Sequence, residues 1–129
     1  MQVKEFKVSL IGHSQTRKTT FLRNLLYGNQ TNINLPKTLG VEVKPFEFHY
    51  NNTKYRLNIW DCGGEYMGLG KEYLKNSHLV VIFKHLTKQS DEFKEWVPNF
   101  CPYICVDMWK ENAVINTLQN IRNTLINNI

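Results

Sequence analysis

The stretch from Gly12 to Thr20 has the residue types and the spacing of a phosphate-binding loop. It reads Gly12, His13, Ser14, Gln15, Thr16, Arg17, Lys18, Thr19 and Thr20. The pattern GxxxxGK[ST] is matched at Gly12, Lys18 and Thr19. In that pattern the backbone N–H groups cradle phosphates, the lysine reaches the β- and γ-phosphates, and the hydroxyl holds Mg²⁺. The segment therefore predicts a nucleotide-binding loop made by all nine residues.

Arg17 departs from the pattern, which has a glycine at this place. A non-glycine residue in the left-handed backbone region costs about 1–2 kcal/mol, and a guanidinium that turns toward a phosphate offsets part of that cost. A second interpretation also fits Lys18 and Thr19, because threonine is a common cap at an ordinary polar helix start. The loop alone leaves both interpretations open.

Apolar residues predict the strands and helices that must position this loop. Phe6, Val8 and Leu10 alternate and run into Ile11, which indicates a buried strand that ends at Gly12. Further along the chain we expect a helix over 21–28 and a hairpin over 41–59, with a turn at 51–53 and a first strand that is kinked at Pro45 and therefore lies at the sheet edge. The remaining expected elements are a strand over 79–83 covered on both faces, a second, shorter strand over 103–106, one or two helical turns over 91–96, and an amphipathic helix from 112.

Strands that alternate with helices indicate parallel βαβ crossovers. We therefore predict an α/β fold of the P-loop NTPase type. It is a three-layer sandwich around a mostly parallel sheet of about five strands, with one antiparallel hairpin at its edge. A chain of 129 residues has room for one domain.

Charge and composition exclude several classes of function. The net charge of +5 comes from lysines spread along the chain, usually near Asp or Glu, which argues against nucleic-acid binding. Three cysteines, Cys62, Cys101 and Cys105, lack the pattern of a disulfide framework or a paired zinc motif, so we expect a reducing, intracellular setting. Because no stretch has the length of a membrane helix and no lipidation signal is present, we expect no membrane anchor.

Two further segments carry a resemblance to a known family. They read Thr38-Leu39-Gly40-Val41-Glu42-Val43 and Trp60-Asp61-Cys62-Gly63-Gly64-Glu65. Together with the phosphate loop, and in the same order, they resemble the Ras-like small GTPases, and most closely the Ran branch. The resemblance runs from about Val3 to Phe83 and fades afterwards.

The resemblance implies a G domain that binds GTP or GDP with Mg²⁺. On the matching positions, Thr38 would hold Mg²⁺ and sense the γ-phosphate, and Gly64 would contact the γ-phosphate through its N–H. Asp61 would bind Mg²⁺ through water, beside Thr19. The residues expected to act in hydrolysis are Lys18, Thr38, Gly64 and Glu65. Taken singly, Thr38, Gly64 and Asp61 also suit a strand entry, a turn and a helix cap.

The chain departs from the family pattern at two functional places. Glu65 stands where the family has the glutamine that orients the attacking water, and its charge repels the γ-phosphate, so hydrolysis should be slow. The guanine-reading motif is missing after 103–106, where Asp107 or Glu111 could supply a carboxylate. One strand and one helix of a complete G domain are also missing, so we expect a single shortened G domain over 1–129.

The leading hypothesis is a Ran-like GTP-binding protein with slow hydrolysis. It would act as a monomeric switch in nucleocytoplasmic transport, in cytoplasm or nucleus, with transport receptors or exchange factors as partners. The alternative is a pseudo-GTPase that binds no nucleotide and serves as a decoy or scaffold for Ran partners. A phosphate-loop kinase or ATPase is a weaker third hypothesis, because the two family segments have no role there.

Overall fold

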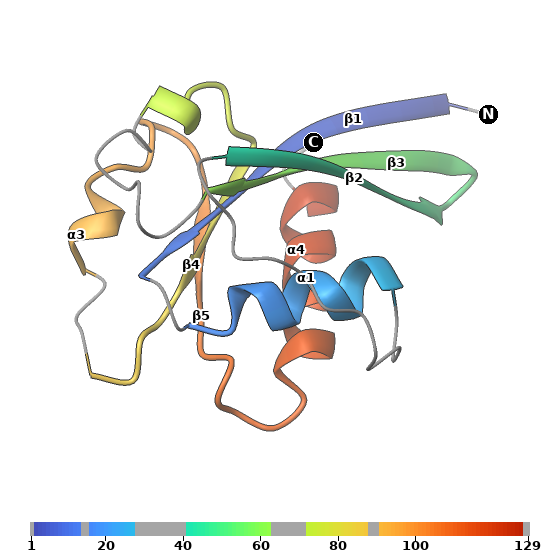
Figure 1. Cartoon of the computed structure of the whole chain (residues 1–129). Helices are drawn as coiled ribbons and strands as arrows, with labels where there is room; N and C mark the ends of the chain where they lie inside the picture. Colours follow the sequence, from blue (N-terminus) through green and yellow to red (C-terminus); the bar gives the residue numbers. More distant parts are fainter. Residues whose placement is uncertain (1, 14–15, 28–40, 63–71, 88–90, 128–129) are drawn as a thin grey trace.

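The computed structural model describes residues 2–13, 16–27, 41–62, 72–87 and 91–127 (Figure 1). Its elements are β1 (Gln2–Gly12), α1 (Lys18–Tyr27), β2 (Val41–Tyr50), β3 (Thr53–Cys62), β4 (Leu79–Phe83), α3 (Asp91–Lys94), β5 (Tyr103–Val106) and α4 (Ala113–Asn127). The strands form one sheet in the order β2-β3-β1-β4-β5. Among the described strands, only β2 and β3 pair antiparallel. The predicted fold class, with its mostly parallel sheet and antiparallel edge hairpin, is confirmed.

Helices cover both faces of the sheet (Figure 1). On one face, Phe21 of α1 and Ile121 of α4 pack in one buried cluster with Val81 of β4. On the other face, Phe93 of α3 packs with Ile82, the next residue of β4. Successive residues of a strand point to opposite faces, so a strand covered on both sides is apolar without alternation. No helix in the described part of the chain is long and apolar enough to span a membrane.

Two asparagines form the turn of the edge hairpin. Asn51 and Asn52 have φ values of +49° and +59°, and two successive left-handed residues make the tight turn that best matches the twist of paired strands. β2 runs without a break through Pro45, which pairs with Asn58. Proline is tolerated here because β2 is an edge strand, where one side of the backbone needs no partner.

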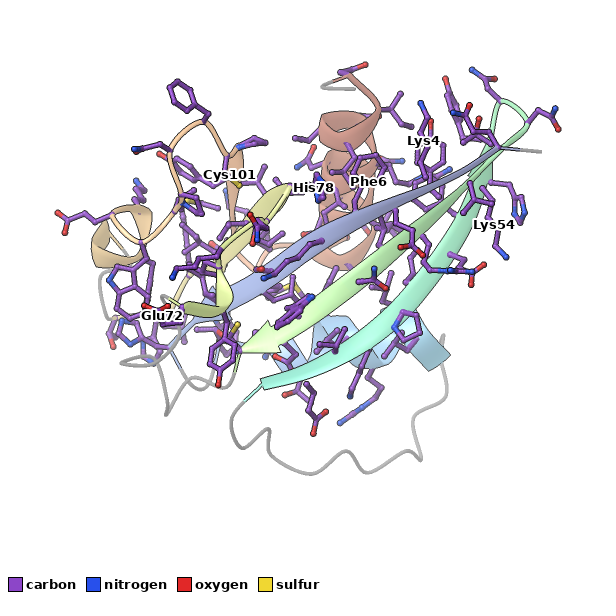
Figure 2. All side chains as sticks on the ribbon, turned by 90° about the horizontal axis from the view of Figure 1, so that it is seen from above. Lys4, Phe6, Lys54, Glu72, His78 and Cys101 are labelled. Atoms are coloured by element: carbon purple, nitrogen blue, oxygen red, sulfur yellow. The ribbon has the colours of Figure 1, made fainter. Side chains whose placement is uncertain are left out.

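The segment before β4 is tied to β1 at the end of the sheet away from the phosphate loop. The Lys7 N–H donates to His78 Nδ1 at 2.8 Å, and the His78 ring meets the Phe6 ring edge-on at 5.2 Å. Figure 2 labels Phe6 and His78 side by side, with Cys101 nearby. The Cys101 thiol donates to the Ser77 carbonyl at 3.2 Å. These contacts hold β1, β4 and the entry to β5 together.

Candidate functional site

Parallel pairing brings residues far apart in sequence to one edge of the sheet. β1 ends at Gly12, β3 at Cys62, β4 at Phe83 and β5 at Val106. All four strands run in the same direction. The carboxyl edge of such a sheet is the usual place for a ligand site in open α/β folds. The predicted phosphate loop starts at this edge and leads into α1.

Gly12 is required by packing as well as by the motif. A Cβ at this position would lie 2.8 Å from the backbone oxygen of Phe83 and 3.2 Å from its Cβ. Gly12 also has a φ of +154°. Any side chain here would push the end of β1 away from β4, so the entrance to the loop depends on glycine.

The two described ends of the loop are tied together. Thr16 is buried, and its hydroxyl donates to the His13 carbonyl at 3.0 Å. The His13 ring meets the Phe93 ring at 4.9 Å and the His85 ring at 6.0 Å between centroids. The loop is thus held against α3 and the segment after β4, while Ser14 and Gln15 lie outside the described residues.

Arg17 has the left-handed backbone that glycine adopts at lower cost, with a φ of +64°. Its carbonyl accepts the Phe21 N–H at 3.0 Å, and this hydrogen bond forms the start of α1. Its guanidinium carbon lies 3.7 Å from the ring centroid of Trp109, in the loop between β5 and α4. The cation–π contact offsets part of the backbone strain. The side chain therefore joins the phosphate loop to the end of β5.

Lys18 and Asp61, the two most chemically informative residues of the motifs, lie together. Lys18 Nζ is 3.3 Å from Asp61 Oδ1 and also donates to the Cys62 carbonyl. Lys18 is 7% exposed and Asp61 is 1% exposed. Burying a charge is costly unless it is paired, so these contacts compensate a buried ammonium beside the first turn of α1. The Cys62 carbonyl could not be predicted as a partner from the sequence, because a backbone acceptor does not depend on residue type.

The Cys62 thiol is a poor nucleophile. Burial raises the pKa of its thiol to about 11, although the nearby Lys18 charge acts in the opposite direction. A thiolate, not a thiol, is the nucleophile, so Cys62 is a packing residue of this edge.

The oxygen donors at this edge fit Mg²⁺ as far as they are described. Thr19 lies partly buried in the first turn of α1, Thr20 is exposed, and the Asp61 carboxylate is buried next to Lys18. Mg²⁺ in nucleotide sites takes one or two protein oxygens and completes its shell with phosphate and water. No group of three His, Cys, Asp or Glu side chains gathers anywhere in the described ranges.

Three predicted site residues, Thr38, Gly64 and Glu65, lie outside the described residues, and their roles stay predictions. Trp109 contacts the phosphate loop although no motif in the sequence includes it. The signal was present: a large aromatic side chain stands in a polar loop directly after a strand end. It is 36% exposed. The backbone N–H of Trp109 donates to Asp107 Oδ1 at 3.0 Å, so one oxygen of this carboxylate, a candidate for base recognition, accepts a hydrogen bond within its own turn.

Comparison with known protein families adds one finding. Residues 7–118 match the family model described as "Ras of Complex, Roc, domain of DAPkinase". The matched range includes the phosphate loop, the end of β3 and the loop that carries Trp109. It extends past Phe83, where the resemblance to the Ran branch fades.

Proposed function

Because the chain belongs to the Roc family of Ras-like GTPase domains, we propose that it binds Mg²⁺-GTP and GDP, holds them chiefly by their phosphates, and hydrolyses GTP slowly. The observation that carries the proposal is the buried pair of Lys18 and Asp61 beside the first turn of α1. The first turn of a helix favours anions, and Lys18 brings a positive charge to that end of α1.

Phosphate binding would change the partners of Lys18. Its ammonium is balanced by Asp61 and the Cys62 carbonyl. A phosphate oxygen that reaches Nζ brings a charge-assisted hydrogen bond, which is about twice as strong as a neutral one. Asp61 and the Thr19 hydroxyl, with Thr38 as the predicted third group, would hold Mg²⁺. The metal would neutralise charge on the β- and γ-phosphates.

Binding is tested by titrating the full chain with a fluorescent GTP analogue and Mg²⁺. We expect saturable binding that Lys18→Ala abolishes. The matched control is Lys75→Ala, since the Lys75 side chain is 70% exposed and pairs only with Glu72 among its described contacts. Absence of binding at tens of micromolar analogue, or equal binding by Lys18→Ala, would overturn the proposal.

Slow hydrolysis rests on Glu65, which lies where the family has glutamine. A carboxylate repels the γ-phosphate and cannot donate an amide hydrogen bond to it or to the water. We expect Glu65→Gln to raise the single-turnover rate of phosphate release by roughly tenfold or more, with nucleotide affinity unchanged. A Glu65→Gln variant that releases phosphate no faster than the wild type would show that Glu65 is not the cause of slow hydrolysis.

The Ran-like part of the proposal rests on the segments around Thr38 and Asp61. It makes the chain a nucleotide switch in nucleocytoplasmic transport, in the cytoplasm or nucleus, with transport receptors or exchange factors as partners. Capture of such receptors that requires added GTP supports this role, and capture that ignores the nucleotide contradicts it.

A pseudo-GTPase is the second candidate, and one observation favours it. Lys18 already has both a carboxylate and a carbonyl partner, and Arg17, in a left-handed backbone conformation, places its guanidinium on the Trp109 ring. A site closed in this way would leave the surface as a decoy or scaffold for Ran partners. Receptor capture by Lys18→Ala at the wild-type level would support this candidate.

A further inference from the structure

Arg17 has a backbone conformation that is unusual for its residue type. Its φ is +64°, and it is one of six non-glycine residues with a positive φ in the described chain. Four of the six are asparagines, whose short polar side chain tolerates this region. For an arginine, the left-handed backbone is disfavoured about 5- to 30-fold against its ordinary conformations. A contact outside its own backbone is therefore needed to keep Arg17 there.

The Trp109 ring supplies such a contact. The guanidinium carbon of Arg17 lies 3.7 Å from the ring centroid. Tryptophan is the best aromatic partner for a cation, and the pair is worth about 2- to 30-fold in an equilibrium, which matches the cost of the backbone. In Figure 1 the turn between β5 and α4, which carries Trp109, and the start of α1 lie at the same end of the molecule. The contact is thus strong enough to hold the arginine backbone in its left-handed conformation.

The turn that carries the ring is itself fixed to the body of the molecule. The backbone N–H of Trp109 donates to Asp107 Oδ1 at 3.0 Å. Met108, directly before Trp109, is 5% exposed and packs in the core cluster that also contains Phe21 of α1. Because the ring is anchored in this way, its contact with Arg17 restrains the phosphate loop from outside the loop.

A change in the Arg17 backbone would displace the groups expected to meet phosphate. Arg17 lies between Thr16, which is 1% exposed, and Lys18, which is 7% exposed. Its carbonyl accepts the Phe21 N–H at 3.0 Å in the first turn of α1. Rotating the backbone of Arg17 would break this hydrogen bond and move Lys18 away from Asp61, 3.3 Å from its Nζ.

We infer that Trp109 is a positioning residue of the phosphate loop: its ring holds Arg17 in the left-handed conformation and so keeps Lys18 and the first turn of α1 in place for phosphate. The inference rests on the proposed function and deepens it, since phosphate affinity then depends on a side chain outside the loop. Trp109 acts through Arg17 and not through a contact with the ligand. A loop that holds its binding conformation only part of the time loses affinity in proportion, so weakening the contact weakens every phosphate ligand by the same factor.

The experiment compares the dissociation constants of Mg²⁺-GTP and Mg²⁺-tripolyphosphate for the full chain and its variants. We expect Trp109→Ala to weaken both ligands by the same factor, about 3- to 30-fold. Trp109→Phe keeps a π-face and should retain most of the affinity. Arg17→Gly adopts the left-handed backbone without help, so adding Trp109→Ala to it should change either dissociation constant by less than about twofold. Tyr103→Ala is the matched control, because Tyr103 is an aromatic residue of β5 with 45% exposure, and it should bind as the wild type does.

Three results overturn the inference and leave nucleotide binding intact. The first is a Trp109→Ala variant that binds both ligands as the wild type does. The second is a loss of affinity for GTP alone, because Trp109 would then contact the nucleoside. The third is an equal loss from Trp109→Ala with arginine or glycine at position 17, since Trp109 would then act without Arg17.

Hydrogen exchange keeps the inference separate from the function on which it rests. If the wild type binds neither ligand, the proposed function fails, and the hold of Trp109 on Arg17 is still measured at the Phe21 amide, which donates to the Arg17 carbonyl. Trp109→Ala should speed exchange of that amide by about threefold or more, because the first turn of α1 opens more often. An unchanged exchange rate overturns the inference.

Discussion

Arg17 joins backbone strain and a side-chain contact in one residue. Its φ of +64° and its contact with Trp109 occur together. Arg17→Gly and Arg17→Ala both remove the contact, but only alanine keeps a Cβ in the left-handed region. We expect Arg17→Gly to have a free energy of unfolding about 1 kcal/mol higher than Arg17→Ala in urea unfolding. Equal stabilities would mean that the loop relaxes out of this conformation.

The three cysteines should differ in reactivity according to burial. Cys62 is buried with a pKa of about 11, Cys101 is partly buried with its pKa raised by burial, and Cys105 is exposed. At pH 8 only about one Cys62 thiol in a thousand is ionised. We expect a thiol reagent to modify one cysteine quickly, and Cys105→Ser should remove that fast phase. Cys62 should react only after unfolding; fast modification of Cys62 in the folded chain would contradict its burial.

The same thiol makes stability depend on pH in one direction. The folded-state pKa of Cys62 lies above the ordinary value of 9.0. Between about pH 9 and pH 11 the Cys62 thiol therefore stays protonated in the folded state, whereas it loses its proton in the unfolded state. This contribution to stability is complete below about pH 9 and is lost as pH rises toward 11.

At the scale of elements, α4 has one buried face and one exposed face. Ile121 is 1% exposed and lies in the cluster between the sheet and the helices, whereas Ile115 on the same helix is 60% exposed. Ile121→Ala should lower the free energy of unfolding by about 2–5 kcal/mol, because it leaves a cavity in the core. Ile115→Ala should change it by less than about 0.5 kcal/mol. Similar effects in urea unfolding would show that α4 docks by another face.

Elements with strong local patterns were predictable from sequence. The continuous apolar run of β4 predicted a strand buried on both faces, and the alternation of apolar and polar residues in β3 predicted a strand buried on one face. Two asparagines predicted the hairpin turn. β2 proved to be one strand through Pro45, because the edge position tolerates a residue that donates no hydrogen bond. Contacts between elements were less accessible to prediction. Arg17 meets Trp109 only because parallel pairing puts the ends of β1 and β5 at the same edge.

At the scale of the whole molecule, the sheet order explains where the candidate site lies. β1 stands between β3 and β4, so the loop after it meets the end of β3, which carries Asp61. Sequence motifs identified Lys18 and Asp61 separately, and the fold makes them a buried pair. The buried pair is the shared basis of phosphate binding, of the proposed metal position and of the alternative in which the site is closed.

Calorimetric titration of Mg²⁺-GTP into the unlabelled full chain tests the central claim most directly. Binding to a pre-formed site should give one nucleotide per chain, with a dissociation constant in the micromolar range or below, and Lys18→Ala should remove the heat while keeping the fold. A wild-type chain that gives no binding heat at several temperatures, or a Lys18→Ala variant that binds as the wild type does, would contradict the account.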